Sequence, residues 1–322
     1  ILQTTMTTIN KNDYKQRVEI LPSPYHYDII SNCKSQTQEE MLLDFIKLQG
    51  NTKTSAFCGN KIIYNFMLEE MLNTRRGVKS GKIQPLLREI WEDPISRNTL
   101  IDQAVKYDRR KGLEQLYPVD IYEAFRFLKG SVNTFKPGIV QYYIKKFNAT
   151  KYLDPCAGWG GRYLGSRSLG IKYTGCDTNL NLRPRYEEMI KLIEPHQTLE
   201  QNDEGFYTDN TRMIFNDFFK VEPSYYGEDD FVLTSPPYSN TEQYNGMEEF
   251  NAINNYYNDF LIPLINKLLE NILVGGTVCI NISNHIYLEY LRCGGKVADE
   301  IEEMPQQTAN KKNKEMVYIF KK

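Results

Sequence analysis

Apolar and polar residues follow two different patterns along the chain, and the change lies near residue 130. Before it, apolar residues recur at the spacing of helices. After it, short apolar runs that are typical of strands alternate with helical stretches. The two patterns predict a small, mostly helical domain at residues 1–130 and an α/β domain at residues 131–322.

The first part has helical periodicity in several segments, separated by glycine, proline or polar residues. One predicted helix ends at Gly50, and another begins at Pro118 and ends at Gly130, which is the glycine position expected after a helix. Asp93 and Pro94 interrupt the pattern between two others. The predicted helices of this part cover residues 36–50, 60–73, 83–92, 96–107 and 118–130.

The second part contains seven runs with the composition of strands. Helices are expected between them, over 139–147, near Arg162, and over 252–273, where Pro263 should kink or divide the helix. A polar loop joins the last two runs, which predicts a hairpin. The predicted strands cover residues 151–154, 172–177, 212–217, 231–234, 275–283, 296–305 and 315–321.

The fourth predicted strand ends in Ser235-Pro236-Pro237-Tyr238. Proline has a nearly fixed φ and no N–H, so this corner is stiff while its carbonyls remain free to accept hydrogen bonds. The Ser235 hydroxyl and the Pro236 carbonyl can accept from the exocyclic amino group of a flat ring that stacks on Tyr238. Taken alone, the tetrapeptide could also be a surface turn that ends a strand.

A glycine-rich turn follows the first predicted strand. Gly158, Gly160 and Gly161 allow a sharp turn and a close approach of backbone to a ligand. A helix opens directly afterwards, near Arg162, and N–H groups at the start of a helix can hold a carboxylate or another anion. Any connection between a strand and a helix can contain such a turn, so the turn indicates a binding site only together with the acids around it.

Three predicted strands end in an acid. Asp177 lies about twenty residues after the glycine turn, where it could accept from ribose hydroxyls. Asp217 could accept from an adenine amino group. Asp154 precedes the turn, where it could hold a cationic amino group and would repel a pyrophosphate, and the turn lacks GxGxxG spacing. The pattern therefore favours S-adenosylmethionine over a dinucleotide.

The composition is that of a globular protein, with 41% hydrophobic and 25% charged residues. The sequence has no apolar run long enough to cross a membrane and no signal-peptide pattern at residues 1–10. Six cysteines without a CxxC pair and three histidines at no ligand spacing make a metal site unexpected. These features favour a reducing, cytoplasmic location. The many Lys, Asn, Ile and Tyr residues indicate an A·T-rich genome, and therefore a bacterium or a virus-infected host cell.

Charge is distributed unevenly although the formal net charge is −2. Residues 1–150 carry 22 Lys/Arg against 16 Asp/Glu, and the basic residues gather in two glycine-flanked clusters. Such clusters can contact phosphates, although ordinary solvated charge is the alternative. The candidate DNA-binding residues are Arg75, Arg76, Lys79, Lys82, Arg109, Arg110 and Lys111.

Residues 135–322 resemble the DNA amino-methyltransferases, which act on cytosine N4 or adenine N6. The stretch 154–161, with sequence DPCAGWGG, resembles the cofactor loop of that family, and Ser235–Tyr238 resembles its catalytic tetrapeptide. Thr234, before the tetrapeptide, is common in cytosine-N4 members. Phe135–Gly138 is similar to the segment that closes over the methionine end of the cofactor. The resemblance implies a Rossmann-like sheet of seven mostly parallel strands, with an antiparallel last strand.

Pattern and resemblance together give the candidate sites. The expected catalytic residues are Ser235, Pro236, Pro237 and Tyr238. The expected S-adenosylmethionine-binding residues are Phe135, Lys136, Pro137, Asp154, Pro155, Cys156, Ala157, Gly158, Gly160, Asp177 and Asp217.

The implied substrate is a base flipped out of double-stranded DNA, as in restriction–modification. Serine at the first position of the tetrapeptide favours cytosine N4, whereas aspartate would favour adenine N6. The intervals between the motifs leave little room for a recognition domain, so the helical domain is the candidate. An RNA or protein-glutamine methyltransferase, a non-catalytic DNA-binding subunit of the same fold, and self-association through the opposite charges remain alternatives.

Overall fold

The structure is a computed structural model. It describes residues 9–10, 27–28, 30–76, 84–106, 115–130, 132–238, 242–243, 255–305 and 315–322. The chain divides into two compact units. The helical unit consists of residues 1–35, 67–133 and 241–243, and the sheet unit of residues 36–66, 134–240 and 244–322.

Among its described residues, the helical unit contains the end of α4 (Asn60–Leu72), three further helices and two short strand pairs. Pro118 lies in the first turn of α7 and Gly130 follows its end with φ +76°, as the sequence predicts. The further helices are α5 (Leu87–Glu92), α6 (Pro94–Lys106) and α7 (Pro118–Lys129). The strand pairs join β1 (Ile9–Asn10) to β3 (Gln115–Leu116) and β2 (Arg75–Arg76) to β10 (Glu242–Gln243).

Residues 36–66, expected in the N-terminal domain, group with the sheet unit. They form α3 (Gln38–Gln49), which starts with a Thr37 capping box, and most of α4 (Asn60–Leu72). The Gln141 amide donates to the Leu48 carbonyl at 2.8 Å and to the Ser168 hydroxyl at 2.8 Å. These buried bonds tie the end of α3 to the sheet unit, and no local sequence pattern could indicate them.

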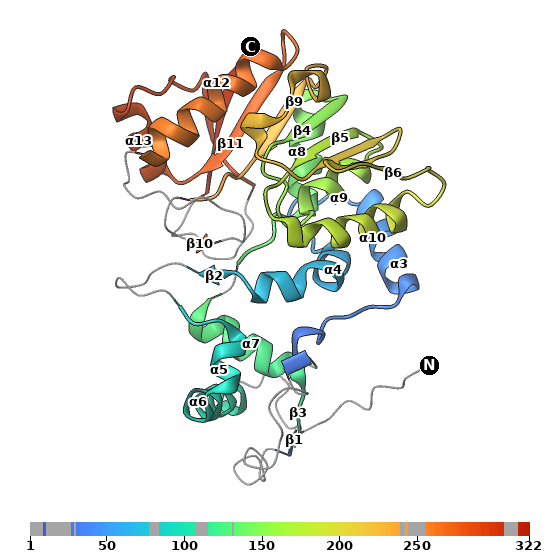
Figure 1. The fold of residues 1–322 in the computed structure, drawn as a ribbon, viewed down its shortest axis with the longest axis vertical. Coiled ribbons are helices and arrows are strands. Elements are labelled where there is room, and N and C mark those ends of the chain that lie inside the picture. The colour runs from blue at the N-terminus through green and yellow to red at the C-terminus, as the bar shows by residue number, and fades with distance from the viewer. Residues whose placement is uncertain are drawn as a thin grey trace. The chain divides into compact units, whose positions relative to one another are not determined.

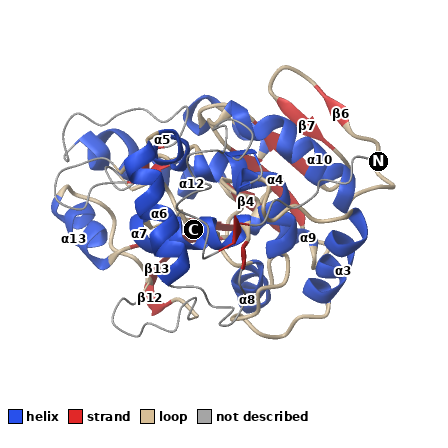
Figure 2. Ribbon diagram, turned by 90° about the horizontal axis from the view of Figure 1, so that it is seen from below, coloured by secondary structure: helices blue, strands red, loops and turns tan. Residues whose placement is uncertain are grey.

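The sheet has nine strands over the described residues, not the seven that the sequence predicted. The two additional strands form a short hairpin at one edge of the sheet (Figure 2). They are two and three residues long, too short for a periodic pattern to be detected. The strands are β4 (Lys151–Asp154), β5 (Lys172–Cys176), β6 (Glu200–Gln201), β7 (Gly205–Tyr207), β8 (Thr211–Ile214), β9 (Phe231–Thr234), β11 (Thr277–Ile282), β12 (Glu300–Glu303) and β13 (Met316–Lys321).

The strand order is β12-β13-β11-β9-β4-β5-β8-β7-β6. Figure 1 labels β11, β9, β4, β5 and β6 of this sheet. The five central strands are all parallel to one another: β8, β5, β4, β9 and β11. The last strand, β13, runs antiparallel to both β11 and β12, which confirms the predicted antiparallel last strand and hairpin. The sheet is therefore a mixed α/β sheet with a parallel centre.

The chain changes direction across the sheet at β4. It runs outward from β4 through β5 to β8, and later returns to place β9 and β11 on the other side of β4. A topological switch point therefore lies between β4 and β9. In open α/β sheets, ligands bind at the carboxyl ends of the strands beside such a point. Asp154 and Thr234 are the last residues of these two strands.

One face of the sheet is aromatic. Tyr152 of β4 and Tyr173 of β5 are directly paired in register, so they lie on the same face, with ring centroids 5.5 Å apart. Tyr163 of α9 packs edge-on against Tyr173 at 5.3 Å and against Tyr186 of α10 at 6.2 Å. The helices that carry this packing are α8 (Pro137–Phe147), α9 (Gly161–Arg167) and α10 (Arg183–Ile193).

The opposite face is covered by α12 (Ile262–Asn271), α13 (Asn284–Arg292) and the π-helical turn η4 (Tyr256–Leu261). Val232 of β9 packs in this core with Leu264 and Leu268 of α12. Near Pro263 the helix is continuous and is not divided: the π-helical turn ends at Leu261 and α12 begins at Ile262, one residue before the proline. The expected kink stays a prediction. Among the described helices, none has the length and hydropathy of a membrane span.

We expect the stability of the sheet unit to depend on pH through Asp229, which precedes β9 and is 4% exposed. Burial, opposed in part by Thr174 and by the charge of Arg212, raises the pKa of Asp229 from 3.8 to about 7. Because the folded pKa is higher than the unfolded one, the ionised carboxyl destabilises the folded state increasingly between these values and fully above pH 7.

Asp229→Asn should therefore raise the denaturant midpoint at pH 8 and have little effect at pH 4, as measured by chemical unfolding. Asp209→Asn, at an exposed aspartate, is the control and should change stability little at either pH. An equal gain for Asp229→Asn at both values would contradict this account.

Candidate active site

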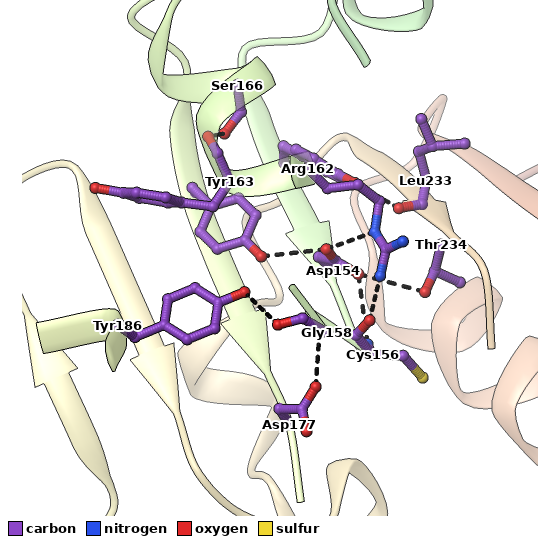
Figure 3. A network of polar contacts seen from close by, with 12 residues as sticks. Asp154, Cys156, Gly158, Arg162, Tyr163, Ser166, Asp177, Tyr186, Leu233 and Thr234 are labelled. Carbon is purple, nitrogen blue, oxygen red and sulfur yellow. Dashed lines mark hydrogen bonds and ion pairs between the residues drawn. The ribbon is translucent and has the colours of Figure 1, made fainter. Parts of the chain in front are cut away.

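The Asp154 carboxylate connects both predicted motifs. Asp154 is 0% exposed and accepts hydrogen bonds from Arg162 Nε at 2.8 Å and from the Tyr173 hydroxyl at 3.1 Å. It also accepts from Thr234 Oγ1 at 3.3 Å, on the other side of the switch point (Figure 3). One buried carboxylate thus joins the ends of β4 and β9 to the first turn of α9.

Arg162 holds the glycine-rich turn from within. In addition to Asp154, its guanidinium donates to the Cys156 carbonyl and lies 5.3 Å from the centroid of the Phe135 ring. Burial disfavours the charge, but the neighbouring Asp154 outweighs it and raises the pKa of Arg162 above its ordinary value. The guanidinium therefore stays charged at the base of the turn.

This arrangement differs from the expectation that Asp154 holds a cationic group of a ligand. The carboxylate already has a cation of the protein as its partner, and it is buried. The negative charge that was expected to repel a pyrophosphate is also compensated by Arg162. The choice between S-adenosylmethionine and a dinucleotide therefore rests on the spacing of the glycines and on the corner after β9.

The turn itself has the predicted conformation. Gly158 and Gly160 have φ of +56° and +79°, which favour glycine. The Ala157 N–H donates to the Cys176 carbonyl at 2.8 Å, and Pro155 and Ala157 are buried. A Cβ built on Gly158 would lie at ordinary contact distances, 3.8 Å from the Cys156 carbonyl oxygen and 4.0 Å from Arg162 Nη2, so the positive φ and not a lack of space favours glycine here.

Asp177 lies beside the turn, as the sequence predicts for a ribose-binding acid. Its Oδ2 accepts from the Gly158 N–H at 2.7 Å, and its Oδ1 accepts from the Asn179 N–H at 2.9 Å. Burial raises the pKa of Asp177 above its ordinary value. The two backbone bonds fix the carboxylate, and each oxygen keeps a second lone pair for a ligand hydroxyl.

Asp217 does not lie in a strand, because β8 ends at Ile214, three residues earlier than predicted. Asp217 instead caps the 3-10 turn η2 (Phe218–Lys220), accepting from the Phe219 N–H at 3.0 Å. Its carboxylate is half-buried and lies 3.8 Å from Lys220 Nζ. Its expected contact with an adenine amino group stays a prediction.

The segment Phe135–Gly138 packs directly against the start of α9. A Cβ built on Gly161 would lie 2.0 Å from the Phe135 carbonyl oxygen, so this approach requires glycine. The Lys136 ammonium lies 3.5 Å from the Ser55 carbonyl and 4.3 Å from the ring centroid of Phe57, and burial lowers its pKa. Pro137 is buried at the start of α8. The segment is thereby fixed next to the glycine-rich turn.

The tetrapeptide after β9 lies at the other side of the switch point. Pro236 is buried, while Ser235, Pro237 and Tyr238 are half-buried. Among the described residues, none makes a hydrogen bond with the Ser235 side chain. Tyr238 packs against the core that α12 covers. The corner therefore presents a hydroxyl and part of an aromatic ring beside the turn.

Sequence reasoning missed Arg162 as a site residue and did not single out Tyr256. Tyr256 is buried at the start of η4, and burial, with smaller contributions from Tyr238 and Cys156, raises its pKa well above the ordinary value. No sequence signal distinguishes it among 23 tyrosines. Arg162 had a signal, because a cation in the first turn of a helix is disfavoured by the helix dipole and requires a partner.

The predicted DNA-binding residues are described only in part. Arg75 donates through both terminal nitrogens to Glu89, with Nη1 2.9 Å from Oε2, so its charge is compensated within the protein. Arg76 lies in β2, and the structure does not describe its side chain. The remaining candidates, Lys79, Lys82, Arg109, Arg110 and Lys111, lie outside the described residues.

Within the described part of the chain, no group of three or more His, Cys, Asp or Glu side chains is arranged to hold a metal ion.

No protein-family model and no curated protein matches the sequence. Similar solved structures include an RNA methyltransferase from Salinibacter ruber in complex with S-adenosyl-L-homocysteine, at 13% identity and TM-score 0.36, which covers 59% of this chain and 92% of that one. An rRNA methylase from Streptococcus thermophilus has 13% identity, TM-score 0.38 and coverage of 59% and 99%. A putative SAM-dependent methyltransferase from Streptococcus mutans has 13% identity, TM-score 0.39 and coverage of 59% and 49%. Likenesses at these TM-scores do not establish a family.

Gly161→Ala should destabilise the sheet unit by about 1–3 kcal/mol, the usual cost of overpacking, because the new methyl group would overlap the Phe135 carbonyl. Gly50→Ala is the control, since the nearest atom to its Cβ lies 3.9 Å away. Thermal unfolding measures both variants. Equal effects of the two substitutions would show that the contact between Phe135 and α9 is not tight.

Proposed function

We propose that this protein is an S-adenosylmethionine-dependent methyltransferase that modifies the exocyclic amino group of a nucleobase. The observation that supports this most is the meeting of two motifs at the switch point of the sheet. The glycine-rich turn follows β4 and the Ser-Pro-Pro-Tyr corner follows β9, and Thr234 Oγ1 donates to Asp154 at 3.3 Å between them.

The residues around the turn fit S-adenosylmethionine. Asp177 is fixed by the Gly158 N–H, with lone pairs left for the hydroxyls of a ribose. Phe135 lies against the start of α9, where the resemblance expects a cover for the methionine end. Asp217 remains the candidate partner of the adenine amino group. When bound, S-adenosylmethionine supplies a methyl group activated by a sulfonium.

The corner is suited to an aromatic amine, which is a poor nucleophile because its lone pair is delocalised into the ring. Ser235 Oγ and the Pro236 carbonyl accept from the two N–H bonds, which favours sp³ character at nitrogen and directs the lone pair at the methyl group. The Tyr238 ring stacks on the base, and its π-electrons stabilise the positive charge that develops during methyl transfer. Positioning supplies much of the rate. The nitrogen would carry the positive charge after methylation and then release its proton to water.

Cytosine N4 in double-stranded DNA is the substrate we favour, with adenine N6 as the next candidate, because serine stands first in the tetrapeptide. The base would reach the corner by flipping out of the duplex. An RNA base presents the same amino groups, so the geometry of the corner supports an RNA methyltransferase as well. A role in restriction–modification is part of the DNA proposal.

Ser235→Ala and Tyr238→Ala should lose methyl transfer by at least tenfold and retain cofactor binding, because both residues face the base. Asp177→Ala should weaken cofactor binding instead. Transfer of radiolabelled methyl groups to DNA, RNA and protein, with calorimetry for S-adenosylmethionine, separates the two effects. Wild-type activity on protein alone, or full activity of both corner variants, would refute the proposal.

The candidate basic residues should contribute to nucleic-acid binding. The combined change of Arg75, Arg76, Arg109 and Arg110 to alanine is expected to weaken DNA binding and flatten its dependence on salt, because fewer counterions are released. The compensated charge of Arg75 should make its share the smallest.

A matched control removes four exposed basic residues elsewhere: Lys145, Lys172, Lys191 and Arg292. Binding titrations over a range of salt concentrations compare the two variants. The same loss of affinity in both would mean that the predicted clusters have no special role.

A further inference from the structure

We propose that Arg162 binds the carboxylate of the methionine part of S-adenosylmethionine and that Asp154 positions it for this purpose. The inference rests on the proposed function and names a contact that the sequence patterns did not assign. Some nitrogens of the Arg162 guanidinium already have partners within the protein, and the guanidinium lies beside the glycine-rich turn.

The protein engages two of the three guanidinium nitrogens. Nε donates to Asp154 at 2.8 Å, and Nη2 donates to the Cys156 carbonyl. Figure 3 shows these two bonds and no dashed line at the third nitrogen, and among the described residues no hydrogen bond involves Nη1. A guanidinium can donate five hydrogen bonds, so this one has donors left for a ligand.

The guanidinium lies against the glycine-rich turn. Its Nη2 lies 4.0 Å from the point that a Cβ on Gly158 would occupy. The Phe135 ring lies over the same guanidinium at 5.3 Å. Arg162 thus lies between the turn and the segment expected to close over the methionine end.

The charges also fit. Asp154 and Arg162 form a buried pair without net charge, and the amino-acid end of S-adenosylmethionine is a zwitterion, also without net charge. The bond from Asp154 to Nε fixes the plane of the guanidinium before a ligand arrives, so less side-chain entropy is lost on binding. A guanidinium so fixed would hold a carboxylate more firmly than the backbone N–H groups of a seven-residue helix alone.

The competing explanation is that Arg162 only fastens the turn to Asp154 and Phe135. The two explanations predict different affinities. If Arg162 contacts the carboxylate, the protein should bind a ligand that has this carboxylate more tightly than a ligand that lacks it. Calorimetry with S-adenosylmethionine and with its decarboxylated analogue therefore tests the inference on the full chain.

The wild-type protein should bind S-adenosylmethionine at least tenfold more tightly than the decarboxylated analogue. The double variant Asp154→Asn/Arg162→Met removes both buried charges together, so that no unpaired charge is left in the core. It should bind the two ligands with nearly equal affinity. Arg162→Lys keeps the charge but lacks the planar set of donors. It should prefer S-adenosylmethionine to the decarboxylated analogue by a factor between those of the other two proteins.

A wild-type protein that binds both ligands equally would overturn the inference and leave the proposed function standing. A double variant that loses affinity for both ligands by the same factor would also overturn the inference, because Arg162 would then act only on the turn. A wild-type protein that binds neither ligand would overturn the proposed function itself.

Discussion

A buried carboxylate at the switch point of the sheet determines how the candidate site is built. Asp154 is the last residue of a central strand and is fully buried, so its charge must be compensated. Arg162 supplies the opposite charge, while Tyr173 and Thr234 supply further hydrogen bonds. Because these partners come from α9, β5 and β9, one group fixes the ends of β4 and β9, the first part of β5 and the start of α9 relative to one another.

The two motifs depend on this arrangement for their geometry. The glycine-rich turn is held on one side by Asp177 and on the other by the guanidinium of Arg162. The tetrapeptide begins directly after Thr234, whose hydroxyl bonds to the same carboxylate as that guanidinium. The buried network therefore fixes the distance between the turn and the corner. This distance would separate a methyl donor bound in the turn from an amine bound in the corner.

The sequence predicted the parts of the sheet that have a strong local signal. Strands β4 and β9 have the predicted bounds, because each is an apolar run that ends at a polar or proline-rich corner. The hairpin of β6 and β7 escaped prediction because it consists of too few residues to show alternation. The grouping of residues 36–66 with the sheet unit, and the pairing of Asp154 with Arg162, depend on contacts between distant elements, which local patterns do not encode.

The account makes one central claim, that the glycine-rich turn and the Ser-Pro-Pro-Tyr corner form a single site for a methyl donor and an amine. A crystal structure with S-adenosyl-L-homocysteine bound tests it most directly. The account predicts the ribose at Asp177, the carboxylate at Arg162 and the sulfur facing the corner at Ser235. A ligand bound elsewhere, or a sulfur directed away from the corner with protein atoms between them, would contradict it.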